Sequence, residues 1–244
     1  MNIEGIINKY FDHIYCLNLD RRIDRWKAMS KRFKKHGIQA SRFPAVDGEA
    51  KENLDRFSSL VRKYGTKDKR LGHKTLRSPG ALGCLLSYRK IIKRSKKRGY
   101  KRILIFEDDV YLSKSFNREF ENIAKIRDDW KLLYLGASQY SWRGVKMMSK
   151  PFYRARVSQG TFAIAIDKSI FDEILTITKD VRIPIDSYLS FSIQKKYKNK
   201  CFVFCPNIAI ADVSNSDIRR PIRDTRRHAK DMRWDLGRYD LDVE

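Results

Sequence analysis

His13-Ile14-Tyr15-Cys16-Leu17-Asn18-Leu19 opens a strand–helix–strand unit that decides the fold. A short, nearly continuous apolar run of this kind is typical of a buried strand. Helical spacing follows, with apolar side chains at Ile23, Trp26, Met29 and Phe33. Gly37 suits the left-handed end of that helix, and a second strand resumes at residues 40–43. The turn after the first strand therefore opens at the carboxyl edge of the sheet, where open α/β sheets bind ligands.

Strands and helices continue to alternate along the chain. Apolar runs predict further strands at residues 103–106, 131–135, 161–166, 201–204 and 207–210. Apolar periodicity predicts helices at residues 54–64, 79–99, 171–175 and 229–234, with a short one after Asp186. This alternation favours a mostly parallel sheet with helices on its faces. We expect a single α/β domain over residues 1–218, followed by a charged tail, 219–244, that packs on it or extends from it.

The chain is strongly basic. Its 53 Lys and Arg residues against 29 Asp and Glu give a formal net charge of +24. From Arg62 to Arg102 there are sixteen cations and one acid, Asp68. A field of this strength attracts polyanions, among them nucleic acid, anionic lipid and nucleotide phosphates. Two interpretations of this basic band remain open: a solvated surface that keeps the protein soluble, or a surface that captures an anionic donor or acceptor.

Cysteine use and hydropathy predict a soluble, cytoplasmic protein. The four cysteines are Cys16, Cys84, Cys201 and Cys205. They form no Cys-x-x-Cys pair and have no His-rich partners, which favours free thiols in a reducing compartment. The first residues lack the basic start and the apolar stretch of a secretory signal. No run approaches the roughly 20 apolar residues that are needed to cross a bilayer.

Three consecutive acids, Glu107, Asp108 and Asp109, follow the apolar strand at residues 103–106. In a buried site their carboxylates would repel one another, and a divalent cation relieves such repulsion. Hard oxygen ligands suit Mg²⁺ or Mn²⁺, and a metal held there could neutralise a diphosphate leaving group as its charge develops. The alternative is that these acids belong to a solvated loop or a helix cap.

Cations and an amide follow the first strand at the same predicted edge. Asn18 is followed by Arg21, Arg22 and Arg25. Arginine binds phosphate in a bidentate manner, and asparagine can pair with a base or a ribose. Positive charge at the start of a helix opposes the helix dipole, which favours a functional reason for these arginines over ordinary surface charge. Asp47-Gly48 is a turn dipeptide and by itself indicates only a turn.

Three later acids are further candidates. Asp186 follows Pro184 and precedes a short helix, so it is either the N-cap of that helix or a general base. A single displacement with inversion needs one carboxylate opposite the leaving group to take the proton of the acceptor. Asp212 and Asp217 are candidates for a further metal ligand or a substrate contact.

Five segments together resemble glycosyltransferase family 25, which includes bacterial lipooligosaccharide galactosyltransferases and procollagen galactosyltransferases. They are residues 14–25 with Asn-Leu and an Arg-rich turn, 43–48 with Ala-Val-Asp-Gly, 79–88 with Gly-Cys-Leu-Leu-Ser, 103–110 reading Ile-Leu-Ile-Phe-Glu-Asp-Asp-Val, and 216–218 reading Ser-Asp-Ile. The opening and acidic segments together make the resemblance specific. Two positions depart from the family, with Tyr88 in place of the usual His and Ala211-Asp212 where Gln is frequent.

The resemblance implies a GT-A fold, a UDP-sugar donor, dependence on Mn²⁺ or Mg²⁺, and inversion at the anomeric carbon. It places the nucleotide sugar near Asn18, Arg21, Arg25, Asp47, Gly48, Ser87, Glu107 and Asp108. It makes Asp109 the direct metal ligand. We expect Glu107 to help it, and Asp212, at a position that departs from the family, to supply a further metal ligand. Asp186 falls where the family has a similar residue, and we take it as the catalytic base.

The expected reaction is transfer of a hexose or N-acetylhexosamine from a UDP-sugar to a hydroxyl on a glycan or on a hydroxylated protein side chain. The basic band favours an acidic or phosphorylated acceptor. The alternative class is a basic nucleic-acid-binding protein or a metal-dependent nuclease that uses the same acids. Against it, the aromatic residues do not interleave with the basic band as a stacking surface requires. A third alternative is a transferase-like fold that binds without catalysis, against which the intact acids argue.

Overall fold

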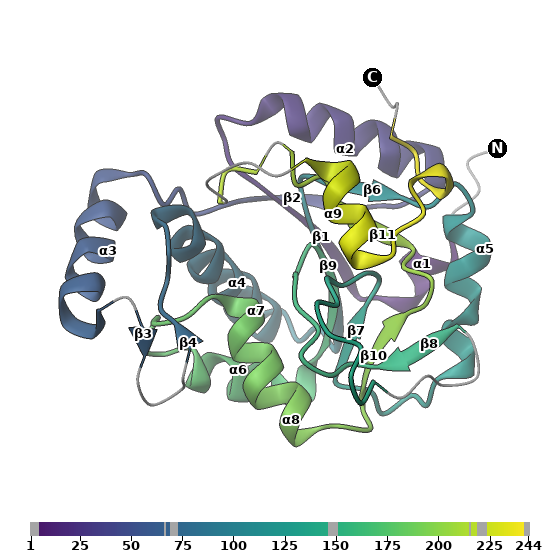
Figure 1. Ribbon diagram of the computed structural model, residues 1–244. Coiled ribbons are helices and arrows are strands. Elements are labelled where there is room, and N and C mark those ends of the chain that lie inside the picture. The colour runs from purple at the N-terminus through teal and green to yellow at the C-terminus, as the bar shows by residue number, and fades with distance from the viewer. Residues whose placement is uncertain are drawn as a thin grey trace.

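The computed structural model describes residues 5–65, 67–68, 73–145, 151–214, 216–218 and 224–241. One sheet of seven strands passes through it, and helices lie on both faces of the sheet (Figure 1). The fold class predicted from the sequence, a single α/β domain with a mostly parallel sheet flanked by helices, is confirmed.

The seven strands lie in the order β2-β1-β5-β9-β7-β10-β8. Their bounds are β1 His13–Asn18, β2 Ser41–Pro44, β5 Arg102–Glu107, β7 Leu132–Tyr134, β8 Phe152–Arg154, β9 Ala163–Asp167 and β10 Cys201–Phe204. β1 pairs in parallel with β2 and β5, and β10 pairs in parallel with β7. β9 runs antiparallel to both of its neighbours, and β8 runs antiparallel to β10. The reversed β9 therefore begins at the edge where β1 and β5 end.

Helices cover the sheet in two groups. Their bounds are α1 Ile6–Tyr10, α2 Ile23–His36, α3 Lys51–Tyr64, α4 Pro79–Lys97, α5 Phe116–Phe120, α6 Phe171–Ile177, α7 Ile185–Tyr188, α8 Gln194–Lys196 and α9 Thr225–Met232. Helices α1, α2, α5 and α9 pack on one face, and α4, α6 and α7 pack on the other. Short 3-10 turns follow α5, precede α6 and follow α9, and a π-helical turn joins α7 to α8.

Alternating side chains of β5 fill the two core layers. Leu104 and Phe106 lie in the layer beneath α2, whereas Ile103 and Ile105 lie in the layer beneath α4. All four are fully buried. Because both faces of the strand are covered, it needs no polar face, which explains its continuous apolar sequence.

Two helix ends form as the sequence predicts. Gly37 ends α2 in the left-handed conformation, with φ of 64°. Ser78 caps α4, because its hydroxyl accepts a hydrogen bond from the Ala81 N–H at 3.2 Å, and Pro79 is the first helical residue. The start of α4 is thereby fixed next to the ends of β1 and β2.

The last predicted strand lies outside the main sheet. β11 (Ala209–Ala211) pairs with β6 (Val110–Leu112), which follows the three acids directly. The pairing brings the chain after residue 211 back to the end of β5. A two-stranded hairpin of β3 (Lys67–Asp68) and β4 (His73–Lys74) follows α3.

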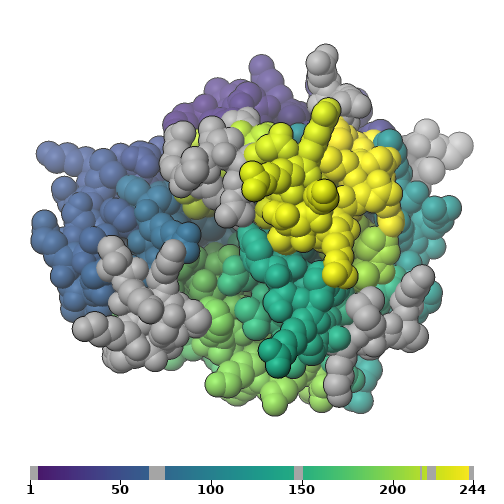
Figure 2. Space-filling model, in the orientation of Figure 1, coloured from purple at the N-terminus to yellow at the C-terminus, as the bar shows by residue number. Residues whose placement is uncertain are grey.

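The C-terminal segment packs on the α2 face of the sheet. The helix expected at residues 229–234 begins earlier, at Thr225, and ends at Met232. Trp234 and Tyr239 after it are buried in the same core layer. In Figure 2 this segment, coloured yellow, lies on the surface against teal residues from the middle of the chain. The domain boundary expected at residue 218 stays a prediction, because residues 219–223 and 242–244 are outside the described ranges.

Two expectations from the sequence, on membrane-spanning segments and on the state of the cysteines, can be compared with the structure. Over the described ranges, no helix has both the length and the apolar composition that a bilayer span requires. All four cysteines are free thiols, and Cys16 and Cys201 are buried. The prediction of free thiols is therefore confirmed.

Candidate active site at the carboxyl edge of the sheet

The ends of β1 and β5 lie side by side, with Leu17 paired to Glu107 in the parallel register. Asn18, the last residue of β1, is 1% exposed. Its Nδ2 donates to Asp108 Oδ2 at 2.6 Å and to the Arg22 carbonyl at 2.9 Å. Its Oδ1 accepts from Arg42 Nε at 2.7 Å. The Asn18 amide is thus fully used in orienting Asp108 and the first turn, and its predicted contact with a nucleotide would require it to exchange one of these bonds.

Asp108 is held between Asn18 and Arg25. Arg25 Nη1 lies 2.7 Å from Asp108 Oδ1, and both side chains are 9% exposed. Charge-assisted bonds of this length orient both partners strongly. The middle acid of the triplet is therefore paired within the protein, and Arg25 offers a diphosphate only its remaining nitrogens. Arg25 Nε and Nη2 are buried and have no hydrogen-bond partner among the described residues.

Asp109 differs from its neighbour, because one of its carboxylate oxygens is unpaired. Oδ1 is buried and has no partner in the described part of the chain, and Oδ2 lies 3.8 Å from Arg25 Nη1. Burial first, and then the charge of Glu107, raise the pKa of Asp109 to about 8, although Arg25 opposes the shift. A buried carboxylate with an orphan oxygen is costly unless a proton or a cation joins it.

Glu107 is oriented by the segment that leads into β9. Thr161 Oγ1 donates to Glu107 Oε1 at 2.8 Å, and Tyr88 Oη donates to the Thr161 carbonyl at 2.6 Å. Tyr88, which stands where the family usually has His, is fully buried and therefore holds this segment in place. Thr161 was not singled out from the sequence, because its contact with Glu107 depends on the antiparallel direction of β9.

Asp186 lies in the same neighbourhood as the acids of β5. Burial first, and then the charges of Glu107, Asp186 and Asp109, raise the pKa of the Cys84 thiol well above its ordinary value. The charges of all three carboxylates therefore act on this one side chain of α4, and Glu107 Oε1 lies 4.0 Å from its sulfur. Asp186 Oδ2 accepts from the Gly160 N–H at 3.4 Å, and Oδ1 accepts from the Ser187 N–H at 2.7 Å. The N-cap of α7 is Pro184, so Asp186 lies in the first turn and is not the cap.

Asp217 joins the arginines that follow β1. Its carboxylate lies 2.6 Å from Arg22 Nη1, 3.4 Å from Arg25 Nη1 and 3.6 Å from Arg21 Nη2. Arg22 is further bound by Asp24 at 2.8 Å. Arg21 makes only long pairs, the second with Asp47 at 3.5 Å, and its side chain is 43% exposed. Of the three arginines, Arg21 is therefore the one most available to an incoming phosphate.

The Asp47-Gly48 loop rests against the start of α4. A Cβ on Gly48 would lie 1.9 Å from the Pro79 carbonyl oxygen, so only glycine allows this approach. Ser87 is fully buried, and its hydroxyl accepts from the Val46 N–H at 2.8 Å. Ser87 and Gly48 thus fix the loop, whereas the side chain of Asp47 is 40% exposed and accessible from solution.

The structure does not present Asp212 as an open metal ligand. Its Oδ2 accepts from Tyr111 Oη at 3.0 Å, and its Oδ1 accepts from the Ser214 N–H and from Thr225 Oγ1 at 3.0 and 2.9 Å. The carboxylate instead anchors the chain that leads to α9. The described residues also contain no group of three or more His, Cys, Asp or Glu side chains arranged to hold a metal. A complete metal site made of protein ligands alone is therefore not preformed.

Fold and site together define an α/β protein that gathers acids and arginines at the ligand-binding edge of its sheet. The chain belongs to glycosyltransferase family 25: the sequence model described as "Glycosyltransferase family 25 (LPS biosynthesis protein)" matches residues 11–189. A glycosyltransferase 25 family member of Anopheles gambiae is 28% identical over 184 residues, which are 72% of this chain and 31% of that protein. Human procollagen galactosyltransferase 2 is 31% identical over 143 residues, which are 54% of this chain and 22% of that protein.

These curated relatives are much longer than the present chain, which spans less than a third of their length. One relative, from Mus musculus, is named inactive glycosyltransferase 25 family member 3 and is 31% identical over 134 residues, which are 53% of this chain and 22% of that protein. Among solved structures, a glycosyltransferase involved in the glycosylation of the major capsid of PBCV-1 has a TM-score of 0.39 at 10% identity, covering 79% of this chain and 92% of the other.

Proposed function

We propose that the protein transfers a hexose or N-acetylhexosamine from a UDP-sugar to an acceptor hydroxyl, on a glycan or a hydroxylated side chain, with inversion and with the help of Mn²⁺ or Mg²⁺. The observation that carries the proposal is the buried, unpaired Oδ1 of Asp109 at the end of β5. Membership of family 25 supports a glycosyltransferase, and the names of the procollagen galactosyltransferases among its relatives support a hexose donor.

The carboxylates fit a divalent cation that is completed by its substrate. Asp109 offers a free oxygen, and Glu107 lies in the same cluster, whereas Asp108 and Asp212 are bound within the protein. Mg²⁺ is commonly held by one or two carboxylates, with substrate phosphates and waters as the remaining ligands. When bound, the ion would supply positive charge against the departing diphosphate.

The arginines after β1 serve the donor from the other side. Arg21, with its exposed guanidinium and long pairs, is placed to donate to phosphate oxygens. Asp47, carried on the loop that Ser87 and Gly48 fix, is placed to accept from a ribose hydroxyl. Arg25 keeps Asp108 paired, so that the negative charge that remains for a cation is concentrated on Asp109 and Glu107.

Asp186 is the proposed base. In a single displacement, its Oδ2 takes the proton of the acceptor hydroxyl while that oxygen bonds to the anomeric carbon and the bond from this carbon to the UDP oxygen breaks. Gly160 N–H holds Oδ2 only at 3.4 Å, so this oxygen is the freer of the two. Gly160 is followed by Thr161, whose hydroxyl donates to Glu107, so this short segment connects Asp186 with the acids at the end of β5.

The test is Mn²⁺-dependent hydrolysis or transfer measured with UDP-galactose, UDP-glucose and UDP-N-acetylglucosamine. Asp109→Asn keeps the shape of the side chain and removes its charge, so we expect activity to fall on the order of hundredfold or more. Asp212→Asn is the matched control, and we expect it to lower the melting temperature while retaining the Mn²⁺ response. Full activity in Asp109→Asn would show that the metal assignment is wrong.

The net charge of +24 also fits a second candidate function, a nucleic-acid-binding protein or a nuclease. A gel shift with duplex DNA and with RNA at about 0.15 M salt separates the two classes. A salt-sensitive gel shift at that ionic strength, with no rise in melting temperature from UDP and Mn²⁺, would favour this second candidate. The four free thiols support a further part of the proposal, that the protein works in a reducing, cytoplasmic compartment.

A further inference from the structure

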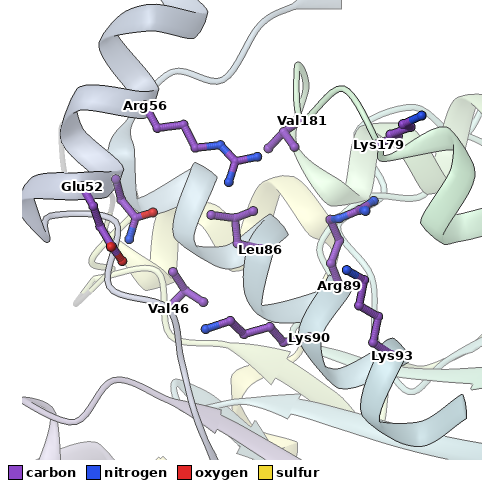
Figure 3. A pocket seen from close by; sticks show the side chains of 10 residues that line it. Val46, Glu52, Arg56, Leu86, Arg89, Lys90, Lys93, Lys179 and Val181 are labelled. Atoms are coloured by element: carbon purple, nitrogen blue, oxygen red, sulfur yellow. The ribbon is translucent and has the colours of Figure 1, made fainter. Parts of the chain in front are cut away.

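A basic cavity lies away from the strand-end acids, between α3, α4 and the turn that follows α6. Its volume is about 340 Å³, and none of the predicted site residues lines it. The cations around it are Arg56, Arg89, Lys90, Lys93 and Lys179, and the one acid is Glu52. Figure 3 shows Arg56 extending from α3 toward Val181 and Arg89 extending from α4 toward Lys179. Three separate elements therefore bring positive charge to one opening.

Among the described residues, these five cations have no carboxylate partner. Within the described ranges of the chain, no Asp or Glu oxygen lies within 4.0 Å of any of their nitrogens. By contrast, the three arginines that follow β1, Arg21, Arg22 and Arg25, all pair with Asp217. Like charges gathered without partners repel, and the arrangement gains stability when an anion joins it.

Arg89 gives the cavity a rigid donor. Its Nη1 donates to the Leu175 carbonyl at 2.7 Å and to Thr178 Oγ1 at 2.5 Å. Burial lowers the pKa of Arg89, and the positive charge of Arg56 lowers it further, so the two guanidinium groups repel each other. A guanidinium that is already fixed loses little side-chain entropy when its remaining N–H groups bind a ligand.

The cavity shares one wall with the proposed donor site. Val46 lines the cavity and is held by Ser87, and Asn53 Nδ2 donates to the Asp47 carbonyl at 2.8 Å. The loop that carries Asp47 thus lies between the two sites. A ligand in the cavity would contact the same loop that carries Asp47 in the proposed donor site.

We propose that this cavity is a second anion site that binds a phosphate group, as a phosphomonoester or a diphosphate. Its volume falls within the range of about 300–1,000 Å³ that is usual for small-molecule pockets. A fixed arginine, a second arginine opposite it and three lysines supply the fork-shaped and point-like donors that phosphate oxygens accept. The site stands independently of the proposed transferase reaction, because it shares none of that reaction's residues.

The experiment is isothermal titration of the full chain, without metal and with EDTA, at about 0.15 M salt so that general attraction is screened. The probes are inorganic phosphate, inorganic pyrophosphate and glucose 6-phosphate, and a parallel arm measures co-sedimentation with phosphatidylcholine vesicles containing phosphatidic acid. The test variant is Arg56→Gln with Lys93→Gln. The matched control is Lys51→Gln with Lys97→Gln, which removes the same charge from exposed positions of the same two helices outside the cavity.

We expect the test variant to bind at least about tenfold more weakly than both the wild type and the control. A loss confined to the soluble probes assigns the site to free phosphate esters, and a loss confined to the vesicles assigns it to a lipid headgroup. Asp109→Asn, which tests the transferase proposal, should bind these probes as the wild type does. Equal affinities in test and control variants, or no binding by the wild type, would overturn the inference. If the double variant is unstable, the same binding comparison is made with the single variant Arg56→Gln.

Discussion

Asp186 and Asp109 are both carboxylates at the carboxyl edge of the sheet, and their surroundings differ. Asp109 has a buried oxygen without a partner, whereas both oxygens of Asp186 accept backbone N–H bonds. We propose that the unpaired oxygen of Asp109 attracts a cation, and that Oδ2 of Asp186, whose hydrogen bond from the Gly160 N–H is 3.4 Å long, takes the proton of the acceptor.

Replacing Asp186 by Asn tests this division of tasks. The amide oxygen can keep the bond from the Ser187 N–H, but the NH₂ group cannot accept from the Gly160 N–H and the side chain cannot take a proton. We therefore expect kcat to fall by about 10²–10⁴-fold with UDP affinity unchanged. Initial rates and UDP titration measure the two quantities. Asp55→Asn, on the exposed face of α3, is the control. A variant with normal kcat would place the base elsewhere.

At the same scale, the sequence predicted which residues meet but not what each one does. Asn18 and Arg25 do lie beside Asp108, but both bind it within the protein. These contacts depend on the register between β1 and β5, which the sequence does not show. Asp217 was proposed as a ligand contact from its motif alone. Its three arginine partners lie about 200 residues earlier in the chain, and no local pattern reports such a contact.

Among the elements, the 44–50 loop packs on α4 through two glycines, Gly48 in the loop and Gly83 in the helix. Gly48→Ala would place a methyl group 1.9 Å from the Pro79 carbonyl oxygen, so the loop or the helix start must move. We expect a loss of about 1–3 kcal/mol in the free energy of unfolding, together with weaker UDP binding. Urea unfolding and nucleotide titration give the two values.

The control for this change is the next residue along. Glu49→Ala removes an exposed side chain without adding atoms to the contact, so we expect a change within about 0.5 kcal/mol. If Gly48→Ala proved as stable as Glu49→Ala, the close approach between the loop and α4 would not exist in solution.

Element boundaries were predictable where a local signal marks them. Gly37 and Ser78 fixed two helix ends, and the apolar run at residues 201–204 matches β10. The direction of β9 was not predictable, because an apolar run reads the same for a parallel and an antiparallel strand. The basic cavity was only half visible: Arg89, Lys90 and Lys93 belong to the basic band, whereas Arg56 and Lys179 reach it from other elements.

For the whole molecule, the C-terminal segment is joined to α2 through a titrating pair. Asp240 lies 2.9 Å from Lys35 Nζ and 3.2 Å from His36 Nε2. Burial lowers the pKa of His36 below its ordinary value of 6.5, although Asp240 opposes the shift. Below about pH 6.5 the unfolded chain therefore takes up a proton that the folded chain resists, and the free energy of unfolding falls as the pH falls.

Asp240 extends the same trend to lower pH. Burial raises its pKa, but the hydrogen bonds from Lys35 and His36 outweigh burial, so its pKa is lowered and its stabilisation is lost as the pH falls through that value. Urea unfolding between about pH 7.5 and pH 5 should show a shallower slope for His36→Gln than for the wild type, and a steeper one for Asp240→Asn. Identical slopes in the wild type and His36→Gln would contradict this account.

The contact of Asp217 with three arginines means that the proposed donor site already holds an internal counter-ion. We expect a bound diphosphate to replace the Asp217 carboxylate as the partner of the arginines, so that few dissolved ions are released or taken up on binding. We therefore expect UDP affinity in the wild type to decline only gently with added salt. In Asp217→Asn, each of the three arginines would lose one carboxylate partner. We expect UDP to bind this variant more tightly at low ionic strength and to lose that advantage steeply as salt is added. Parallel salt titrations of the two proteins would show the difference, and matching curves would mean that Asp217 leaves the arginines before any nucleotide arrives.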